Sequence, residues 1–325
     1  MWISLNAGGL WEGRTTIATT TDVAGQPAVT LDKPVIDVSW YSGTLGYVYV
    51  SYIEWHNDDV GQSRVMLRRS TNLTKRCRPT GGGCIDPFEA PVAVASGADA
   101  GNLARPQVVV NSTNGNVYVL YISGYTGAIY MKKSTDYGVT FGPQIKISNI
   151  TRTEHYLNQT SARAFSVPIA RYNPVTNKLM VVWHQGETLA NDTDLYYTFF
   201  DPDTATSSTN FNVKHIVLPY EQWSPSVDND DSGKALISYY DNNEGAGWGF
   251  RQMGLYVDAS GNKVTSVSPN PASLNYGGAG LLTPSNVFGE YHDLVFWGTK
   301  WRAPIVRSLV SGCTCAADIT VVEVQ

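Results

Sequence analysis

The sequence predicts an all-β domain in which a unit of four antiparallel strands is repeated along the chain. Two observations carry this prediction. Apolar and polar residues alternate in short runs, as in Ala128 to Lys133 and Gln144 to Ser148, and such alternation is typical of half-buried strands. A short turn motif also recurs after such runs at intervals of roughly 60 to 70 residues, which indicates repeated supersecondary units.

The best copy of the turn motif runs from Ser134 to Phe141. Ser134 and Asp136 can bond backbone amides two residues further on, Gly138 can adopt a positive φ, and Phe141 can fold back as an apolar plug. Worn copies follow other expected strands and begin at Ser4, Ser70, Asp201 and Asp258. These spacings suit units of four strands with extended loops.

The expected strands follow this period from one end of the chain to the other. A short first unit is followed by four units of four strands and a last unit of three. In order, they are Trp2 to Ser4 and Thr15 to Thr19; Val35 to Trp40, Tyr47 to Tyr52, Arg64 to Arg69 and Ala90 to Val94; Gln107 to Val110, Asn116 to Ile122, Ala128 to Lys133 and Gln144 to Ser148; Phe165 to Tyr172, Lys178 to His184, Leu195 to Phe200 and Val213 to Leu218; Ser226 to Asp228, Ala235 to Tyr240, Gln252 to Val257 and Lys263 to Val267; Asp293 to Trp297, Trp301 to Arg307 and Asp318 to Val324.

The pattern Ser-x-Asp-x-Gly-x-Thr-Phe at Ser134 to Phe141 resembles the Asp box, the repeat of the sialidase (neuraminidase) superfamily. This resemblance implies a β-propeller of sialidase type, which has six blades. The count of first strands gives five blades and the count of third strands gives six, so five or six four-stranded blades are expected. We expect a single propeller domain over residues 1–325, closed by strands from both termini.

The composition narrows the classes of partner. The chain has 325 residues, 42% hydrophobic and 16% charged, so a substantial core is available and wholesale disorder is not expected. The net charge is −5 and there is no basic run, which argues against a nucleic-acid partner. No apolar stretch is long enough to span a bilayer, and no clustered metal ligands or cofactor motif is apparent, so neither a metal nor a cofactor is expected.

The four cysteines predict at most two small bridges. Cys77 and Cys84 enclose a short Gly-rich loop that a disulfide would close. Cys313 and Cys315 are compatible with a strained bridge or with two thiols. We expect a secreted or otherwise extracytoplasmic protein whose leader segment has been removed.

In a propeller, the starts of first strands and the loops between second and third strands meet around the mouth of a central channel. Cations, carboxylates and aromatic rings at those positions suit a sugar, since aromatic faces stack on the ring and planar polar groups bind hydroxyls or a carboxylate. An Arg at a strand start also has a purely structural alternative, which is to cap the strand or pair with a nearby carboxylate. The expected substrate-binding residues are Arg105, Arg163, Trp223, His292, Trp55 and His184.

Sialidases grip a sugar carboxylate with three arginines and use a Tyr–Glu pair as nucleophile with an Asp as acid/base. The resemblance therefore points to Tyr291, Glu290 and Asp32 as catalytic candidates. The Arg-Ile-Pro motif of sialidases is absent, however, so the resemblance implies the sialidase fold more strongly than sialidase catalysis.

Three hypotheses follow: a glycan-active enzyme, either a hydrolase or a lyase; a non-catalytic glycan- or protein-binding propeller such as a lectin or adhesin; and a scaffold whose channel is plugged by Trp223 and Tyr291. Recognition of a glycan is favoured, with the question of turnover left open.

Overall fold

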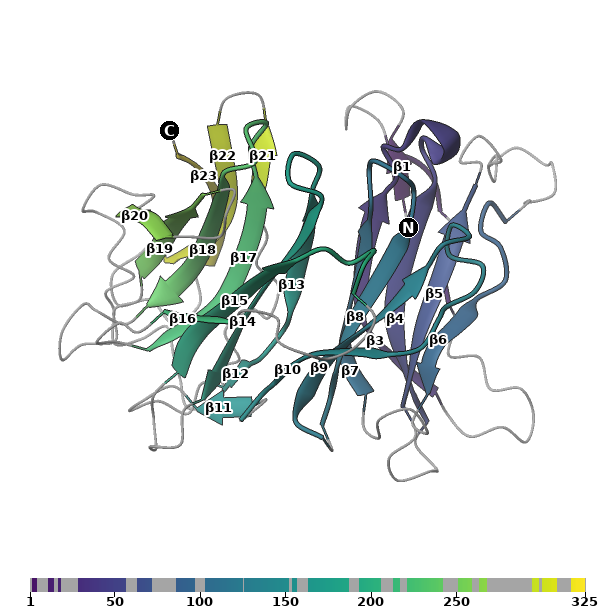
Figure 1. Ribbon diagram of the computed structural model, residues 1–325, viewed down its shortest axis with the longest axis horizontal. Helices are drawn as coiled ribbons and strands as arrows, with labels where there is room; N and C mark the ends of the chain where they lie inside the picture. The colour runs from purple at the N-terminus through teal and green to yellow at the C-terminus, as the bar shows by residue number, and fades with distance from the viewer. Residues whose placement is uncertain are drawn as a thin grey trace. The chain divides into compact units, whose positions relative to one another are not determined.

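The computed structural model describes most of the chain, and it is almost entirely β-structure (Figure 1). The described residues are 2–4, 11–14, 17–18, 29–56, 63–71, 86–96, 103–124, 126–151, 154–156, 163–186, 193–205, 213–216, 221–241, 251–258, 263–267, 294–297, 300–308 and 317–324. The chain divides into two compact units, Met1–Lys146 and Ile147–Gln325, and the boundary falls within a strand. All four cysteines lie outside the described residues, so the predicted Cys77–Cys84 bridge stays a prediction.

The first unit holds one two-stranded and two four-stranded antiparallel sheets. In each sheet the strands lie side by side in the order of the sequence, which makes every sheet a simple meander. The sheets contain β1 (Trp2–Ser4) and β2 (Trp11–Arg14); β3 (Val29–Val38), β4 (Val48–His56), β5 (Ser63–Ser70) and β6 (Val92–Ser96); and β7 (Leu103–Val110), β8 (Val117–Ser123), β9 (Ala128–Ser134) and β10 (Ile145–Asn149). A short 3-10 turn, η1 (Ser42–Thr44), joins β3 to β4.

The second unit repeats this organisation. Its described sheets contain β11 (Glu154–Tyr156) and β12 (Arg163–Phe165); β13 (Ile169–Asn173), β14 (Lys178–Gly186), β15 (Thr193–Phe200) and β16 (Lys214–Ile216); β17 (Gln222–Asn229), β18 (Ala235–Asp241), β19 (Arg251–Val257) and β20 (Lys263–Val267); and β21 (Val295–Trp297), β22 (Lys300–Ser308) and β23 (Ala317–Val324).

These sheets confirm the predicted all-β class and the four-stranded antiparallel unit, with two local corrections. The expected strand Phe165 to Tyr172 is divided, because β12 ends at Phe165 and Pro168, which has no N–H to donate to a ladder, precedes β13. The expected strand Thr15 to Thr19 is wrong, since Ile17 lies in a bend and the strand after β1 is β2. The number of blades and the closure of a single domain stay predictions.

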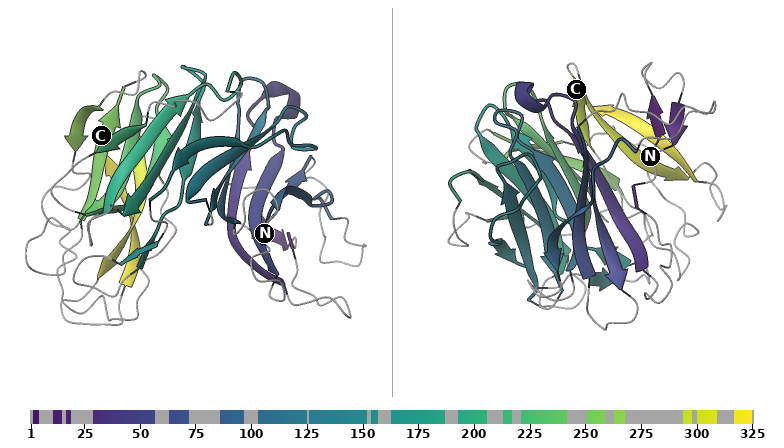
Figure 2. Two further views of the ribbon diagram at one scale, coloured as in Figure 1. Left: turned by 60° about the horizontal axis from the view of Figure 1, so that its bottom comes forward. Right: turned by 90° about the vertical axis from the view of Figure 1, so that its right-hand side faces the viewer.

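The core of each unit lies between neighbouring sheets, and the second strand of each four-stranded sheet is covered on both faces. Every residue of β8 and of β18 is buried, because each strand has a hydrogen-bonded neighbour on either side and another sheet packed against it. Figures 1 and 2 show the sheet of β7–β10 beside the sheet of β3–β6 within the first unit, where β3, β4 and β5 all contact β7.

An aspartate on the first strand of a sheet links that sheet to the next one in both units. The Asp37 carboxylate in β3 accepts a hydrogen bond from the Val110 N–H of β7 at 2.8 Å. The Asp228 carboxylate in β17 accepts one from the Phe296 N–H of β21 at 2.7 Å. Both aspartates lie three residues after a proline, Pro34 or Pro225, so a shared Pro-x-x-Asp pattern positions an inter-sheet clasp.

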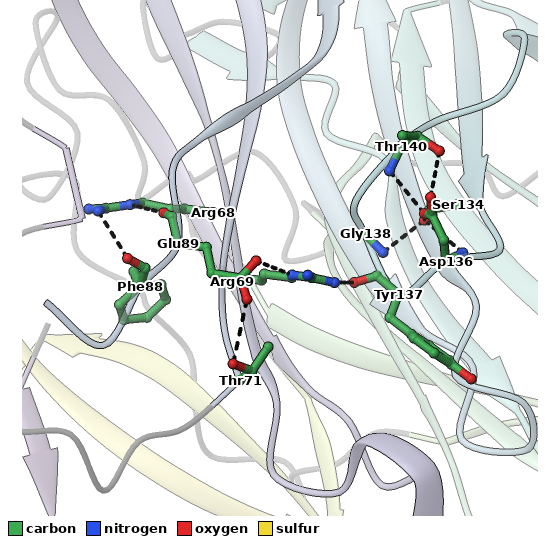
Figure 3. Close-up of polar contacts among 10 residues, drawn as sticks. All are labelled: Arg68, Arg69, Thr71, Phe88, Glu89, Ser134, Asp136, Tyr137, Gly138 and Thr140. Atoms are coloured by element: carbon green, nitrogen blue, oxygen red, sulfur yellow. Dashed lines mark hydrogen bonds and ion pairs between the residues drawn. The ribbon is translucent and has the colours of Figure 1, made fainter.

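The turn after β9 is held by hydrogen bonds of the Ser134 and Asp136 side chains, whose shortest contacts with backbone N–H groups are four residues further on rather than the expected two (Figure 3). The Ser134 hydroxyl donates to the Asp136 carboxylate at 2.7 Å and accepts from the Gly138 N–H at 2.8 Å. Thr140 donates both its N–H, at 2.9 Å, and its hydroxyl, at 2.6 Å, to Asp136. Gly138 has φ +87°, and Phe141 packs against the core of the first unit.

These hydrogen bonds lower the pKa of the Asp136 carboxyl. Burial acts to raise the pKa of the Asp136 carboxyl, but the hydrogen bonds from Thr140 and Ser134 outweigh it and lower the pKa to about 2. The carboxylate is therefore the form that the folded turn requires.

A second set of bonds ties this turn to the neighbouring sheet. Arg69, in β5, donates to the Tyr137 carbonyl at 2.7 Å and to the Glu89 carboxylate at 2.6 Å, as Figure 3 shows. Tyr137 has φ +60°, a conformation that costs free energy for a side chain of this size. The Arg69 bond holds the strained carbonyl in place, so the turn is fixed from two sheets at once.

Candidate functional site

The same backbone irregularity occurs in the first strand of three four-stranded sheets. In β3, β7 and β17 the pairing register shifts by a bulge at a dipeptide ending in proline. The residue before each proline has a positive φ, namely +53° at Lys33, +58° at Arg105 and +46° at Ser224. This conformation is uncommon for residues other than glycine, and a bulge re-aims the side chain that it carries.

Lys33 and Arg105 are presented by neighbouring strands of the first unit, since β3 contacts β7. Burial lowers the pKa of the Lys33 ammonium below its usual value, the Asp32 carboxylate acts in the opposite direction, and the positive charge of Arg105 lowers the pKa again. Two neighbouring strands of the first unit thus each carry a cation at a bulge, and we name Lys33 and Arg105 the cation pair.

Asp32 accompanies the cation pair. Its carboxylate accepts a hydrogen bond from the Lys33 N–H at 2.7 Å, and the Lys33 ammonium lies 3.8 Å from its second oxygen. The Asp32 side chain is 43% exposed and that of Lys33 only 18%. Asp32 is therefore the more exposed of the two side chains, and it supplies Lys33 with a carboxylate partner.

Polar residues occupy the ends of the paired second strands. Glu54 in β4 lies opposite Leu31, and Ser123 in β8 lies opposite Leu103, each three residues before the bulge proline of its sheet. Asp241 in β18 occupies the same position opposite Gln222. Since these positions share one register, carboxylate and hydroxyl groups gather at the sheet ends from which the bulges project.

The equivalent sheet end in the second unit also carries polar residues, but its side chains are buried. Gln222 is fully buried, and among the described residues neither its amide nitrogen nor its amide oxygen has a hydrogen-bond partner. The Trp223 ring beside it is also fully buried and stacks on Tyr240 at a centroid distance of 6.2 Å. An unpaired buried amide is costly, so Gln222 is a polar group that the fold retains for some other reason.

The structure places the predicted binding residues unequally. Arg105 lies in the cation pair and Asp32 beside it. Trp55 is part-buried near the end of β4 and packs against the core, and His184 is 1% exposed within β14. The expectation that Trp55 and His184 lie in loops between second and third strands is wrong, because β4 and β14 continue through them.

Other predicted residues have no described environment. Arg163 begins β12, and only its backbone is described. Glu290, Tyr291 and His292 lie outside the described residues, so their catalytic and binding roles stay predictions. Trp223 is 0% exposed, which matches a packing residue better than a stacking platform.

Sequence reasoning placed Lys33 at a strand start near the channel mouth without giving it a binding role, and it did not single out Gln222. A signal for the first was present, since Lys33-Pro34, Arg105-Pro106 and Ser224-Pro225 recur at strand starts. No signal of this kind marks Gln222, because burial of an amide at a strand end depends on the elements packed over it.

Metal and membrane features can be assessed only over the part of the chain that the structure describes. There, no group of three or more His, Cys, Asp or Glu side chains is placed to hold a metal ion. Within the same residues, no helix has the length and apolar character needed to cross a membrane.

No protein-family model and no curated protein sequence matches this chain. Solved structures do resemble it at low identity. A protein of unknown function from Dyadobacter fermentans is 10% identical with a TM-score of 0.55, and the match covers 91% of this chain and 83% of that one. An α-L-arabinofuranosidase from Fusarium graminearum, in complex with an iminosugar inhibitor, is 13% identical with a TM-score of 0.53, covering 99% and 83%.

A PL25 ulvan lyase bound to a glucuronate–sulfated rhamnose unit is 13% identical with a TM-score of 0.49, covering 90% of this chain and 66% of that one, and supports no conclusion at that score. The two stronger likenesses concern the fold alone. With the four-stranded antiparallel sheets, they support a β-propeller fold.

Proposed function

We propose that this protein recognises an acidic glycan and binds its carboxylate or sulfate group at the cation pair of Lys33 and Arg105. The observation that carries the proposal is the pair itself. Two strained bulges on neighbouring strands, β3 and β7, each carry a cation. An Arg guanidinium binds a carboxylate through two parallel hydrogen bonds, and a Lys ammonium adds a second positive charge.

The surrounding residues favour a sugar over a simple anion. Glu54 lies at the corresponding end of β4, and its carboxylate can bind hydroxyl groups. The structurally similar arabinofuranosidase is a sugar-processing enzyme, and we carry sugar recognition from that protein to this chain as part of the proposal.

A finer, sialidase-like form of the proposal adds catalysis at the mouth of a closed, single-domain propeller of five or six blades. In this form Tyr291 and Glu290 act as the nucleophilic pair, Asp32 as acid/base, and Arg163 and His292 bind substrate. Its support is the Ser134–Phe141 motif. We place such a protein outside the cytoplasm, where glycan polymers are found.

A non-catalytic lectin is the second candidate, and the absence of the Arg-Ile-Pro motif of sialidases favours it. The two candidates share the glycan ligand and differ in turnover.

Affinity electrophoresis in gels that contain polygalacturonate, hyaluronan or a neutral arabinan tests the proposal. The wild-type protein is expected to be retarded by the acidic polymers, and Arg105→Met to lose roughly 10- to 100-fold in affinity for them. Ser224→Ala, at the equivalent bulge of the second unit, is the matched control and should bind as the wild type does. Equal mobility in all three gels would refute the proposal.

A further inference from the structure

The first unit exposes large apolar side chains on two turns that lie far from the bulges in the sequence of each sheet. The turn between β3 and β4 carries Trp40, which is 74% exposed, and Leu45, which is 63% exposed. The turn between β9 and β10 carries Tyr137 and Val139, and both side chains are also exposed. Apolar residues scattered singly over a surface are normal, whereas a group of them marks a surface that binds something.

Contacts between aromatic rings join these two turns. Tyr41 and Tyr137 stack, with ring centroids 6.4 Å apart and ring planes 24° apart. Both rings lie against Gly115 in the turn between β7 and β8, where an added Cβ would be 2.7 Å from the Tyr41 ring and 2.9 Å from the Tyr137 ring. Gly115 therefore leaves the room that both rings occupy, and three turns from two sheets form one surface. We name Tyr41, Tyr137 and the neighbouring Trp40 the aromatic platform.

The backbone holds the platform in a fixed conformation. In the β3–β4 turn the Ser39 N–H donates to the Tyr47 carbonyl at 2.9 Å, and the Gly46 N–H donates to the Ser39 carbonyl at 3.0 Å. Arg69 binds the carbonyl of the strained Tyr137, and Figure 3 shows the Tyr137 ring pointing away from that contact. Strained residues persist mainly where the side chain they aim has a task, and an ordered surface loses little conformational entropy on binding.

The area of the platform suits a small, rigid ligand better than a second protein. Aromatic side chains can bury roughly 150–250 Å² each, so the exposed parts of the platform, Leu45 and Val139 together offer on the order of 500 Å². A stable interface between two proteins buries about 800 Å² on each partner. The platform is therefore smaller than the surface that a stable dimer needs.

The chemistry of the platform favours a sugar ring. A pyranose with equatorial hydroxyls carries C–H bonds on its two faces and hydroxyls around its edge, so its faces pack on aromatic rings while its edge forms hydrogen bonds. Among the described residues, the Trp40 indole N–H and the hydroxyls of Tyr41 and Tyr137 have no hydrogen-bond partner. The platform thus offers both the apolar faces and the polar groups at ring edges that such a sugar requires.

We propose that the aromatic platform binds a neutral polysaccharide of pyranose units, with sugar rings stacked on Trp40 and on the Tyr41–Tyr137 pair. The platform follows the end of β3, whereas the cation pair lies at bulges near the starts of β3 and β7. This inference goes beyond the proposed function, because it assigns a second surface and an uncharged class of ligand. It does not depend on binding of an acidic glycan at the cation pair.

Affinity electrophoresis of the full chain in gels with hydroxyethylcellulose, arabinoxylan or arabinan tests the platform. The wild type should be retarded by the first two polymers, which have pyranose backbones, and not by arabinan, whose five-membered rings lack a flat face. Trp40→Ala and Tyr137→Ala should each weaken the retardation roughly 5- to 20-fold, and Trp40→Tyr should restore most of it. Val175→Ala replaces an exposed apolar residue of the second unit and, as the matched control, should bind as the wild type does.

Arg105→Met separates this inference from the proposed function. This variant should keep its retardation by the neutral polymers, and a loss of that retardation would overturn the independence of the platform. Equal mobility of the wild type with and without the neutral polymers overturns the platform and leaves the proposed function standing. Unchanged retardation of both alanine variants, with melting temperatures that show them folded, also overturns it.

Sedimentation velocity addresses the other occupant of such a surface, a second copy of the chain. The wild type and Trp40→Ala should have the same mass in solution. A wild-type dimer that Trp40→Ala dissociates would assign the surface to self-association and overturn the sugar site.

Discussion

The bulges of β7 and β17 have the same backbone and different tasks. Both shift the register of a first strand at a residue–proline pair, and both hold the residue before proline at a positive φ. Around Arg105 the bulge serves the cation pair, whereas around Ser224 it lies beside Gln222 and Trp223, which are fully buried. The comparison teaches that the bulge is a structural device of the fold and that function depends on which side chain it carries.

Replacement of Trp223 should give the largest difference in stability between the two sheet ends. The position two residues before the bulge proline holds Asp32 in β3, Ala104 in β7 and Trp223 in β17. Trp223→Ala should lower the free energy of unfolding by about 3–5 kcal/mol, because it leaves a cavity in a packed core. Asp32→Ala removes a half-exposed side chain and should cost less than about 1 kcal/mol. Urea unfolding measures both, and similar losses would mean that the two sheet ends are packed alike.

The inter-sheet clasps should behave alike in the two units. Asp37→Ala and Asp228→Ala each leave a backbone N–H, of Val110 or Phe296, without its carboxylate partner. We expect each to destabilise the protein by about 1–3 kcal/mol. Amide hydrogen exchange should show faster exchange at Val110 in the first variant and at Phe296 in the second. Unchanged protection at both amides would contradict the clasp.

Glycine at the third bulge tests the strain directly. Ser224→Gly removes the side chain that disfavours φ +46°, and the relief of strain should exceed the entropic cost of glycine. We expect the variant to be as stable as the wild type or up to about 1 kcal/mol more stable. Thermal unfolding checks this, with Ser226→Gly, in the regular part of β17, as a control that should be destabilised. A clear loss of stability in Ser224→Gly would show that the bulge is not strained.

The turn after β9, which the Asp136 carboxylate holds, should give the smallest effect. That effect is a pH dependence of the melting temperature. The folded-state pKa of Asp136 is about 2, below its unfolded value, so its contribution is present above about pH 4 and is lost as the pH falls through 2. Asp136→Asn lacks this contribution at every pH. The difference in melting temperature between the two proteins should therefore shrink between pH 4 and pH 2, and a constant difference would argue against the ionised staple.

The local sequence pattern was sufficient to predict the positions of most strands. It was not sufficient to predict whether the residues at the strand ends are buried. Alternation located β8, β9, β18 and β19 to within a residue or two, because each is a short run rich in apolar residues. His184 was expected to end its strand at the channel mouth, yet β14 continues past it to Gly186 and His184 is buried. Periodicity predicts which residues of a strand face the core. It does not predict that other elements pack over a polar strand end and bury it.

The candidate site was predictable for the same reason only in part. Arg105 was recognised from its place before a proline at a strand start, and the same signal at Lys33 describes its partner. Their placement on neighbouring strands depends on the contact between β3 and β7, which no local pattern contains. Trp223 shares the strand-start position but is sealed by Tyr240, so residue type alone assigned it wrongly to an open surface.

The most direct test is a crystal structure of the protein soaked with a short galacturonate oligosaccharide. The account predicts a uronate carboxylate within about 2.7–3.1 Å of the Arg105 guanidinium. Density for the sugar at another place, with Lys33 and Arg105 contacting only protein groups, would contradict the assignment of the cation pair as the glycan site.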